Sequence, residues 1–179
     1  MNKNSTKNLV FAGLFLALGL ILPFFTGQIQ AIGNKLLPMH IPVLICGFLL
    51  GWKYGMVVGF TVPLLRSVLF GMPPMFPIAI AMSFELATYG LMTGLLYKLL
   101  PKKGVFTYIN LILSMIAGRI VWGIASFVLF NMAGMEFTKQ IFIAGAFLNA
   151  IPGIILQLLI IPVLIILLEK SKVIQFANK

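Results

Sequence analysis

Two arginines and one glutamate interrupt stretches of the chain that are otherwise almost entirely apolar. Arg66, Glu85 and Arg119 each lie inside a long hydrophobic run, whereas the other two acidic residues, Glu136 and Glu169, flank such runs. A charge at the centre of a bilayer costs about 3 kcal/mol even on lenient insertion scales, so it normally faces a bundle interior, a ligand or water. The three residues are therefore the first candidates for a site that binds a polar small molecule.

Three further polar residues in or beside the apolar runs are candidates for the site. Asn149 and Gln157 lie in the last run, and His40 precedes Pro42 at the start of the second. A hydrogen bond between helices explains Asn149 and Gln157 as well as a ligand contact does, and His40 is equally suited to capping a helix. We predict that the substrate-binding residues are Arg66, Glu85, Arg119, Asn149 and His40.

Arg66 and Glu85 also have a purely structural explanation. They are expected on consecutive antiparallel helices, where they could neutralise each other and lock the hairpin. That pairing leaves Arg119 without an acidic partner, because Glu136 and Glu169 belong to a loop and to the tail. An unpaired buried arginine favours a ligand with an anionic or carbonyl group. The sequence leaves both explanations of Arg66 and Glu85 open.

The residue types that catalysis and metal binding require are scarce. The chain has no Asp, a single histidine and a single cysteine, Cys46, so no disulfide and no CxxC metal site can form within it. It contains no HExxH motif, no G-x-S-x-G motif and no nucleophile beside a plausible base. GFLLGWK, residues 47–53, lacks the GxxxxGK[ST] spacing of an ATP-binding loop. We predict no catalytic residue, no metal site and no cofactor.

The elements that must position the polar residues are membrane helices. Of the 179 residues, 61% are hydrophobic and only 9% are charged, and the mean hydropathy is +1.11. The net charge of +10 is spread between apolar runs rather than along a stripe with aromatic residues, which argues against a nucleic-acid partner. We predict an all-α integral membrane protein, a single domain over residues 1–179, in contact with the lipid bilayer.

Apolar runs bounded by Pro, Gly, Lys or Asn predict six transmembrane helices in one bundle. The second and third runs are separated only around Lys53, which lies between two aromatic residues as is typical of a membrane interface. Residues 41–71 are also too many for one straight span at about 1.5 Å per residue. The predicted spans are residues 8–26, 41–53, 54–71, 77–98, 105–132 and 139–169.

The lysines predict the orientation of these spans. Six spans place both termini on one side of the membrane, and the positive-inside rule assigns the more basic side to the cytoplasm. We therefore predict a multi-pass protein of the cell membrane with cytoplasmic N and C termini. The lysines on the predicted cytoplasmic side are Lys3, Lys7, Lys53, Lys98, Lys102, Lys103, Lys170, Lys172 and Lys179, and those on the other side are Lys35 and Lys139.

Helix geometry places the polar residues in the outer half of the membrane. Counted from the predicted span ends, Arg66 and Glu85 lie about 7 and 12 Å below the outer boundary, and Arg119 and Asn149 lie about 15 to 20 Å below it. We predict one cavity that opens outward. The prolines of GMPPMFP, residues 71–77, cannot continue either flanking helix. The residues predicted to form a lid over the cavity are Met72, Met75 and Phe76.

Two segments resemble a known membrane protein family. The first is FAGLFLALG in the first span, where Gly13 and Ala17 form an AxxxA-like pair. The second is IPVLICGFLLGWKYGMVVGF, residues 41–60, which is similar to a P-x-L-x-x-G-x-x-x-G-x-x-x-G passage. Together with length and span number, these segments resemble the substrate-binding (S) components of energy-coupling factor (ECF) transporters, which import vitamins in bacteria and archaea. The resemblance covers essentially the whole chain.

The resemblance implies an S component rather than an enzyme. Such a protein captures a vitamin-like solute outside, associates with a transmembrane coupling protein and two ATPase subunits, and topples to deliver the solute inward. The surface that contacts the coupling protein is implied to include Gly13 and Ala17, with glycine in place of the first alanine of the usual motif.

The identity of the solute stays open. Two arginines favour a carboxylate or phosphate, which among vitamins favours pantothenate, whereas Glu85 and the aromatic residues also allow pyridoxine or a pyrimidine precursor of thiamine. A small integral-membrane lipid enzyme and a membrane assembly factor without a ligand are the alternative functions.

Overall fold

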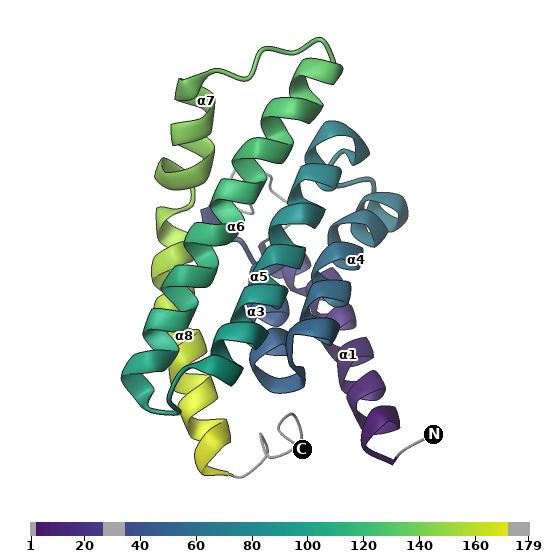
Figure 1. The fold of residues 1–179 in the computed structure, drawn as a ribbon. Helices are drawn as coiled ribbons and strands as arrows, with labels where there is room; N and C mark the ends of the chain where they lie inside the picture. The colour runs from purple at the N-terminus through teal and green to yellow at the C-terminus, as the bar shows by residue number, and fades with distance from the viewer. Residues whose placement is uncertain (1–2, 27–34, 172–179) are drawn as a thin grey trace.

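The computed structural model describes residues 3–26 and 35–171, which form one bundle of helices (Figure 1). All elements in these ranges are helical, which confirms the predicted all-α class. The elements are α1 (Lys3–Ile21), the 3-10 helix η1 (Leu22–Thr26), α3 (His40–Leu50), α4 (Trp52–Phe70), the π-helix η2 (Met75–Ala79), α5 (Ile80–Leu99), α6 (Gly104–Met132), α7 (Lys139–Ile143), the π-helix η3 (Ala144–Leu148) and α8 (Ile151–Lys170).

Five of the six predicted spans contain a helix that is long and apolar enough to cross a membrane. The exception is α3, the predicted span 41–53, which has 11 residues. At about 1.5 Å per residue it extends for about 16 Å, roughly half of the hydrocarbon thickness. The five long segments are Ser5–Phe25, Trp52–Phe70, Met75–Leu99, Gly104–Met132 and Ile151–Lys170.

Two breaks in the chain have identifiable causes. The predicted break between the second and third spans is found at Gly51, whose φ of 85° lies in the left-handed region that glycine adopts readily. The last predicted span, 139–169, is not one continuous helix, because α8 begins only at Ile151 with a proline in its first turn. Proline is well suited to the first turn of a helix, where it has no backbone hydrogen bond to lose, although Pro63 and Pro162 also lie inside α4 and α8. Asn149 consequently lies at a junction.

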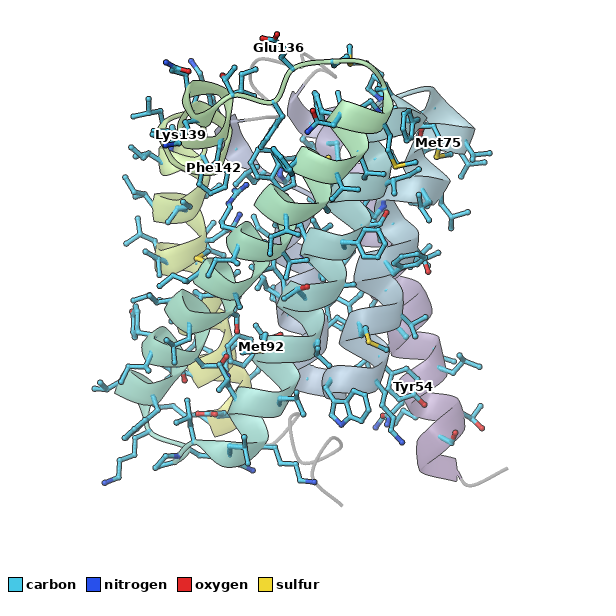
Figure 2. The ribbon with its side chains drawn as sticks, turned by 45° about the horizontal axis from the view of Figure 1, so that its top comes forward. Tyr54, Met75, Met92, Glu136, Lys139 and Phe142 are labelled. Atoms are coloured by element: carbon cyan, nitrogen blue, oxygen red, sulfur yellow. The ribbon has the colours of Figure 1, made fainter. Side chains whose placement is uncertain are left out.

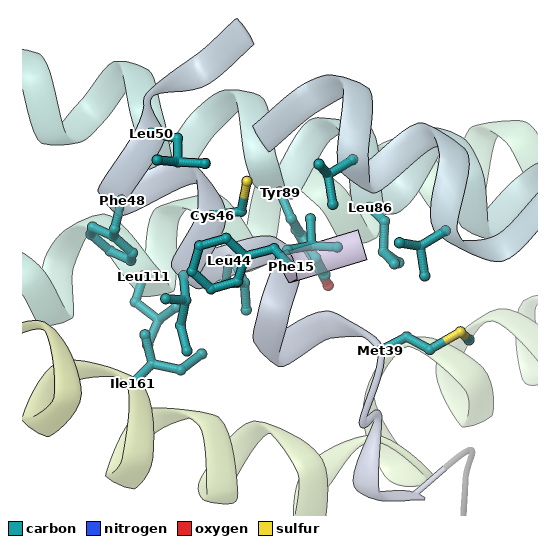
Figure 3. Close-up of a cluster of buried hydrophobic side chains, with 14 of the residues drawn as sticks. Phe15, Met39, Leu44, Cys46, Phe48, Leu50, Leu86, Tyr89, Leu111 and Ile161 are labelled. Atoms are coloured by element: carbon teal, nitrogen blue, oxygen red, sulfur yellow. The ribbon is translucent and has the colours of Figure 1, made fainter. Parts of the chain in front are cut away.

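The hydrophobic core surrounds α3. Figure 3 shows Leu44 and Phe48 of α3 beside side chains from α1, α5, α6 and α8, and both residues are completely buried. The bundle presents its remaining large apolar side chains outward, among them Val10 of α1 and Ile124 of α6, which are mostly exposed. Such an inverted surface is suited to lipid rather than to water.

Glycines allow α3, α4 and α5 to approach closely. A Cβ atom on Gly90 of α5 would lie 2.1 Å from the carbonyl oxygen of Gly55 in α4, and one on Gly47 would lie 2.6 Å from the carbonyl oxygen of Gly90. These small residues therefore serve internal packing of the bundle. Gly13 is different, because a Cβ atom there would meet nothing within 4 Å.

Different segments of the chain form the two ends of the bundle. The start of α1, the end of α8 and the α5–α6 connection lie at one end (Figure 1), together with Tyr54 and its neighbour Lys53 (Figure 2). Met75, Glu136 and Lys139 lie at the opposite end (Figure 2).

Candidate substrate-binding site

A cavity of about 200 Å³ lies among α3, α5, α6 and η3, in the half of the bundle opposite to the start of α1. Two helical faces provide most of its wall. Ile78, the adjacent pair Ala81 and Met82, and Glu85 follow one another about one helical turn apart along η2 and α5, and α6 contributes a similar row. The lining residues are Leu37, His40, Ile78, Ala81, Met82, Glu85, Arg119, Trp122, Ser126, Phe130, Gly145 and Asn149.

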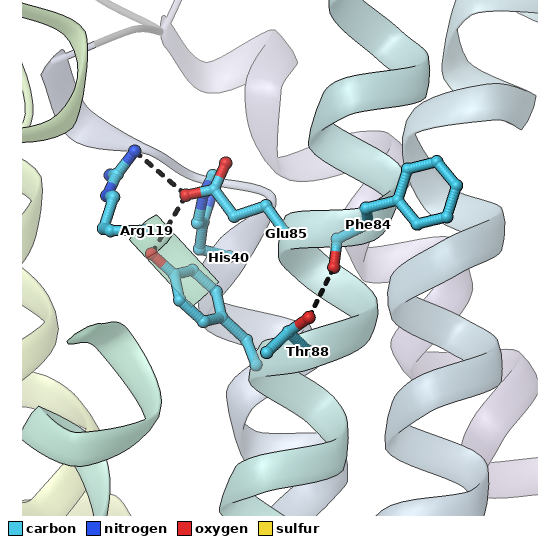
Figure 4. Close-up of polar contacts among 6 residues, drawn as sticks. His40, Phe84, Glu85, Thr88 and Arg119 are labelled. Atoms are coloured by element: carbon cyan, nitrogen blue, oxygen red, sulfur yellow. Dashed lines mark hydrogen bonds and ion pairs between the residues drawn. The ribbon is translucent and has the colours of Figure 1, made fainter. Parts of the chain in front are cut away.

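Glu85 is the centre of the polar cluster in this cavity. Its Oε1 atom lies 2.9 Å from Nη1 of Arg119 and accepts a hydrogen bond of 3.0 Å from the Tyr89 hydroxyl (Figure 4). Nε2 of His40 lies 3.6 Å from the same oxygen. Glu85, Tyr89 and His40 are each only 1% exposed, and Arg119 is 7% exposed. The prediction that no acidic residue of the chain neutralises Arg119 is therefore wrong.

Arg119 nevertheless keeps unused hydrogen-bonding capacity. Its Nε and Nη2 atoms are buried and have no hydrogen-bond partner within residues 3–26 and 35–171, and the same holds for the Ser126 hydroxyl. The Nε–H and Nη2–H groups form one edge of the guanidinium, a fork that matches a carboxylate or phosphate. A buried donor without a partner costs about 1 to 3 kcal/mol, so this edge is suited to a ligand acceptor.

His40 reaches the cluster because the segment before α3 packs tightly on α8. A Cβ atom on Gly153 of α8 would lie 2.6 Å from the carbonyl oxygen of Lys35, so only glycine leaves room for this segment. The backbone N–H of His40 then donates to the Leu37 carbonyl over 3.1 Å, and α3 begins. The imidazole is thereby held as part of the cavity wall.

Arg66 is not part of this cavity. Its Nη1 atom donates to the carbonyl oxygen of Leu20 near the end of α1. The guanidinium carbon lies 4.9 Å from the ring centroid of Phe24 and 5.4 Å from that of Phe70. The alternative pairing of Arg66 with Glu85 is also wrong, because Glu85 pairs with Arg119. Arg66 instead fastens α4 to the end of α1 and to η1, through the hydrogen bond to Leu20 and the cation–π contact with Phe24, while the contact with Phe70 lies within α4.

The remaining predicted residues have mixed positions. Asn149 lines the cavity but is exposed, so it belongs to the rim. Gln157 is buried but does not line it. The predicted lid residues Met72, Met75 and Phe76 lie in and beside the α4–α5 turn and do not line the cavity, although the nearby Ile78 does. The lid stays a prediction.

Sequence reasoning missed several residues of the site, among them three aromatic residues and a serine. Trp122, Ser126 and Phe130 follow Arg119 on the same face of α6, and Tyr89 follows Glu85 by one turn of α5. The i, i+3, i+7 and i+11 spacing from Arg119 is the signal that would have found the first three. Tyr89 fits because the neighbouring α6 residue is Gly118, where a Cβ atom would lie 2.0 Å from the tyrosine ring.

A second cleft, of about 350 Å³, lies between α6 and α8. Its lining is apolar apart from Arg119 and includes Phe142, whose ring stacks on Trp122 at 6.2 Å between centroids. It offers no set of polar groups that would orient a ligand. The smaller cavity, where several polar groups converge, is therefore the candidate substrate site.

Comparison with known proteins identifies the class to which this site belongs. Residues 7–165 match the family described as ECF transporter, substrate-specific component. No curated protein and no solved structure matches the chain. The matched range contains the five long apolar helices almost completely, and also the cluster of His40, Glu85 and Arg119. The chain therefore belongs to the substrate-specific components of ECF transporters, membrane subunits that bind a small-molecule substrate and interact with an ECF module.

Proposed function

We propose that the cavity beside Arg119 captures the transported substrate, and that this substrate is a small vitamin or vitamin precursor with a carboxylate. The unpaired Nε and Nη2 edge of Arg119 is the observation that carries the proposal. Ser126 and Asn149 are additional hydrogen-bonding groups of the wall. Among the vitamins considered, pantothenate fits best, because its carboxylate matches the guanidinium edge and its flexible hydroxylated chain suits a cavity of about 200 Å³.

A flat heterocycle is the second candidate. Trp122 and Phe130 line the cavity, and Trp122 is held in place by Phe137 and Phe142, with ring centroids 5.9 and 6.2 Å away. A pyridoxine or pyrimidine ring could stack on this wall and accept hydrogen bonds from Arg119. Glu85 already balances the charge of Arg119, so an uncharged ligand is compatible with the site.

Titration calorimetry of the purified protein with all three compounds tests the proposal. We expect pantothenate to bind with a dissociation constant at least about tenfold below those of pyridoxine and the thiamine-precursor pyrimidine, since only its carboxylate uses both free donors of Arg119. Tighter binding of either heterocycle would select the second candidate. Native mass spectrometry of the freshly purified protein is an independent check, because a retained compound identifies itself by mass.

The alternative functions find little support in the site. The hydroxyl of Ser126 is the candidate nucleophile in the cavity wall. Its oxygen makes no hydrogen bond to His40 or to any other described residue. A serine needs an adjacent base to become nucleophilic. A lipid-modifying enzyme therefore lacks its activated group, and a pure assembly factor would not need a buried guanidinium with a free edge.

We further propose that the termini face the cytoplasm and that α3 provides the sixth crossing. The start of α1 and the end of α8 lie at the same end of the bundle (Figure 1), which requires an even number of crossings. The five long helices of the described residues are an odd number, so α3 must provide the sixth crossing. Lys53, Lys98, Lys102, Lys103 and Lys170 belong to the proposed cytoplasmic end, in keeping with the positive-inside rule.

Cysteine labelling tests this orientation. We expect an impermeant thiol reagent to label Met75→Cys, but not Lys102→Cys, on intact cells, because the two positions lie at opposite ends of the bundle. The native Cys46 is completely buried and gives a low background. Permeabilised cells should label at both positions. Labelling of Lys102→Cys alone on intact cells would reverse the orientation.

A further inference from the structure

The charges of the empty site already sum to zero. Glu85 of α5 is paired with Arg119 of α6, and both are almost completely buried. His40 of α3 faces this pair. Among the described residues, Tyr89 of α5 is a further titratable group beside His40, with its ring centroid 5.4 Å from that of the imidazole. An additional buried charge without a counter-charge is unfavourable. With a neutral imidazole on His40, the empty site carries no excess charge.

A bound carboxylate changes this balance, and this step rests on the proposed function. The free edge of Arg119 would then hold the carboxylate of the ligand while Nη1 holds Glu85. Two carboxylates would share one guanidinium in a buried site, which leaves one negative charge in excess. Like charges this close disfavour each other unless a proton or another cation joins them.

We propose that the protein binds its anionic substrate together with one proton, and that His40 is the proton site. Nε2 of His40 lies 3.6 Å from Oε1 of Glu85. A proton on this nitrogen is therefore placed directly beside the carboxylate that would share Arg119 with the ligand. The imidazole also lines the cavity through which the ligand arrives. The protonated histidine restores a net charge of zero: two carboxylates, one guanidinium and one imidazolium.

The sign of the resulting pH dependence follows from linkage. Because binding takes up a proton, a lower proton concentration opposes binding. Between pH 7 and pH 8 the affinity for an anionic ligand falls by up to about tenfold, the limit for uptake of one proton. A neutral ligand creates no excess charge, so its affinity does not change over this range. Proton uptake by His40 thus favours an anionic ligand over a neutral one.

Calorimetry in two buffers measures the coupled proton directly. The purified protein is titrated with pantothenate at pH 7.5 in phosphate and in Tris, which differ in ionisation enthalpy, and the difference in observed heat gives the number of protons taken up. We expect about one proton for the native chain. His40→Gln keeps a hydrogen-bonding group but holds no proton, and it should reduce the uptake to near zero. Pantothenol, in which an alcohol replaces the carboxylate, is the matched neutral ligand and should bind without proton uptake.

The outcomes separate this inference from the proposed function. Pantothenate that binds with equal heats in both buffers overturns the proton site and leaves the substrate proposal intact. An unchanged uptake in His40→Gln also overturns it, because the proton then resides elsewhere. If His40→Gln does not fold, the contrast between pantothenate and pantothenol on the native chain decides: equal uptake with both ligands is the contradicting result. Absence of pantothenate binding overturns both the substrate proposal and the inference that rests on it.

Discussion

Replacing Arg119 by methionine is expected to weaken the binding of pantothenate by at least about 30-fold. The variant removes the two free donors of the guanidinium edge, and loss of a charge-assisted contact of this kind costs about 2 kcal/mol or more. Arg119→Lys keeps the charge without the planar edge, so it should bind more weakly than the native chain but better than Arg119→Met. Titration calorimetry of the three proteins provides the measurement.

Arg119→Met is also expected to lower the stability of the protein, and a double variant separates this effect from the loss of affinity. Arg119→Met leaves Glu85 as a buried carboxylate without its ion pair, a change that typically costs about 3 to 5 kcal/mol of folding stability. Combining it with Glu85→Gln removes the uncompensated charge. We expect the double variant to recover most of the lost melting temperature while its affinity stays low.

Arg66→Met is the matched control. Arg66 is also a buried arginine, but it holds α1 against α4 and does not line the cavity. Its replacement should lower the melting temperature and leave the affinity for pantothenate within about twofold of the native value. If Arg66→Met weakens binding as much as Arg119→Met does, or if the double variant binds normally, the substrate site lies elsewhere.

Replacing Ala17 by tryptophan is expected to abolish uptake by the complete transporter while leaving substrate binding intact. We propose that Gly13 and Ala17 face the transmembrane coupling protein, which associates with the two ATPase subunits. Gly13 is exposed and has free space around it, and Ala17 lies one turn further along α1 and is partly exposed. Small residues at this spacing allow a second helix to approach closely, and an indole ring would prevent that approach.

A bulky residue on another lipid-facing helix controls for effects of size alone. Ile124 of α6 is 62% exposed, so Ile124→Trp adds bulk on a surface outside the proposed interface. We expect normal uptake for Ile124→Trp and none for Ala17→Trp, with native affinity for pantothenate in both isolated proteins. Parallel loss of binding and uptake in Ala17→Trp would instead assign Ala17 to internal packing.

Much of the architecture could be predicted from the sequence because lipid imposes simple rules. An apolar segment of about 20 residues in a bilayer must satisfy its own backbone hydrogen bonds, so hydropathy alone predicted four long helices close to their actual bounds, whereas the last predicted span, 139–169, began 12 residues before α8. The glycines at positions 47, 55 and 90 are typical of close helix packing, because a side chain at these positions would collide with the backbone of the neighbouring helix.

The tertiary structure alone decided which buried charges meet. The rise per residue fixes the height of a side chain but not the direction in which its helix turns it, and Arg66 and Arg119 were both compatible with Glu85 in height. In the folded chain Arg66 faces α1 and contacts Leu20, whereas Arg119 faces α5 and pairs with Glu85. The rotation of each helix is set by packing against its neighbours, as where Gly118 admits the ring of Tyr89. The sequence by itself therefore determined that this protein crosses a membrane and buries a few charges. Only packing decided that Glu85 occupies one edge of Arg119 and leaves the other edge free.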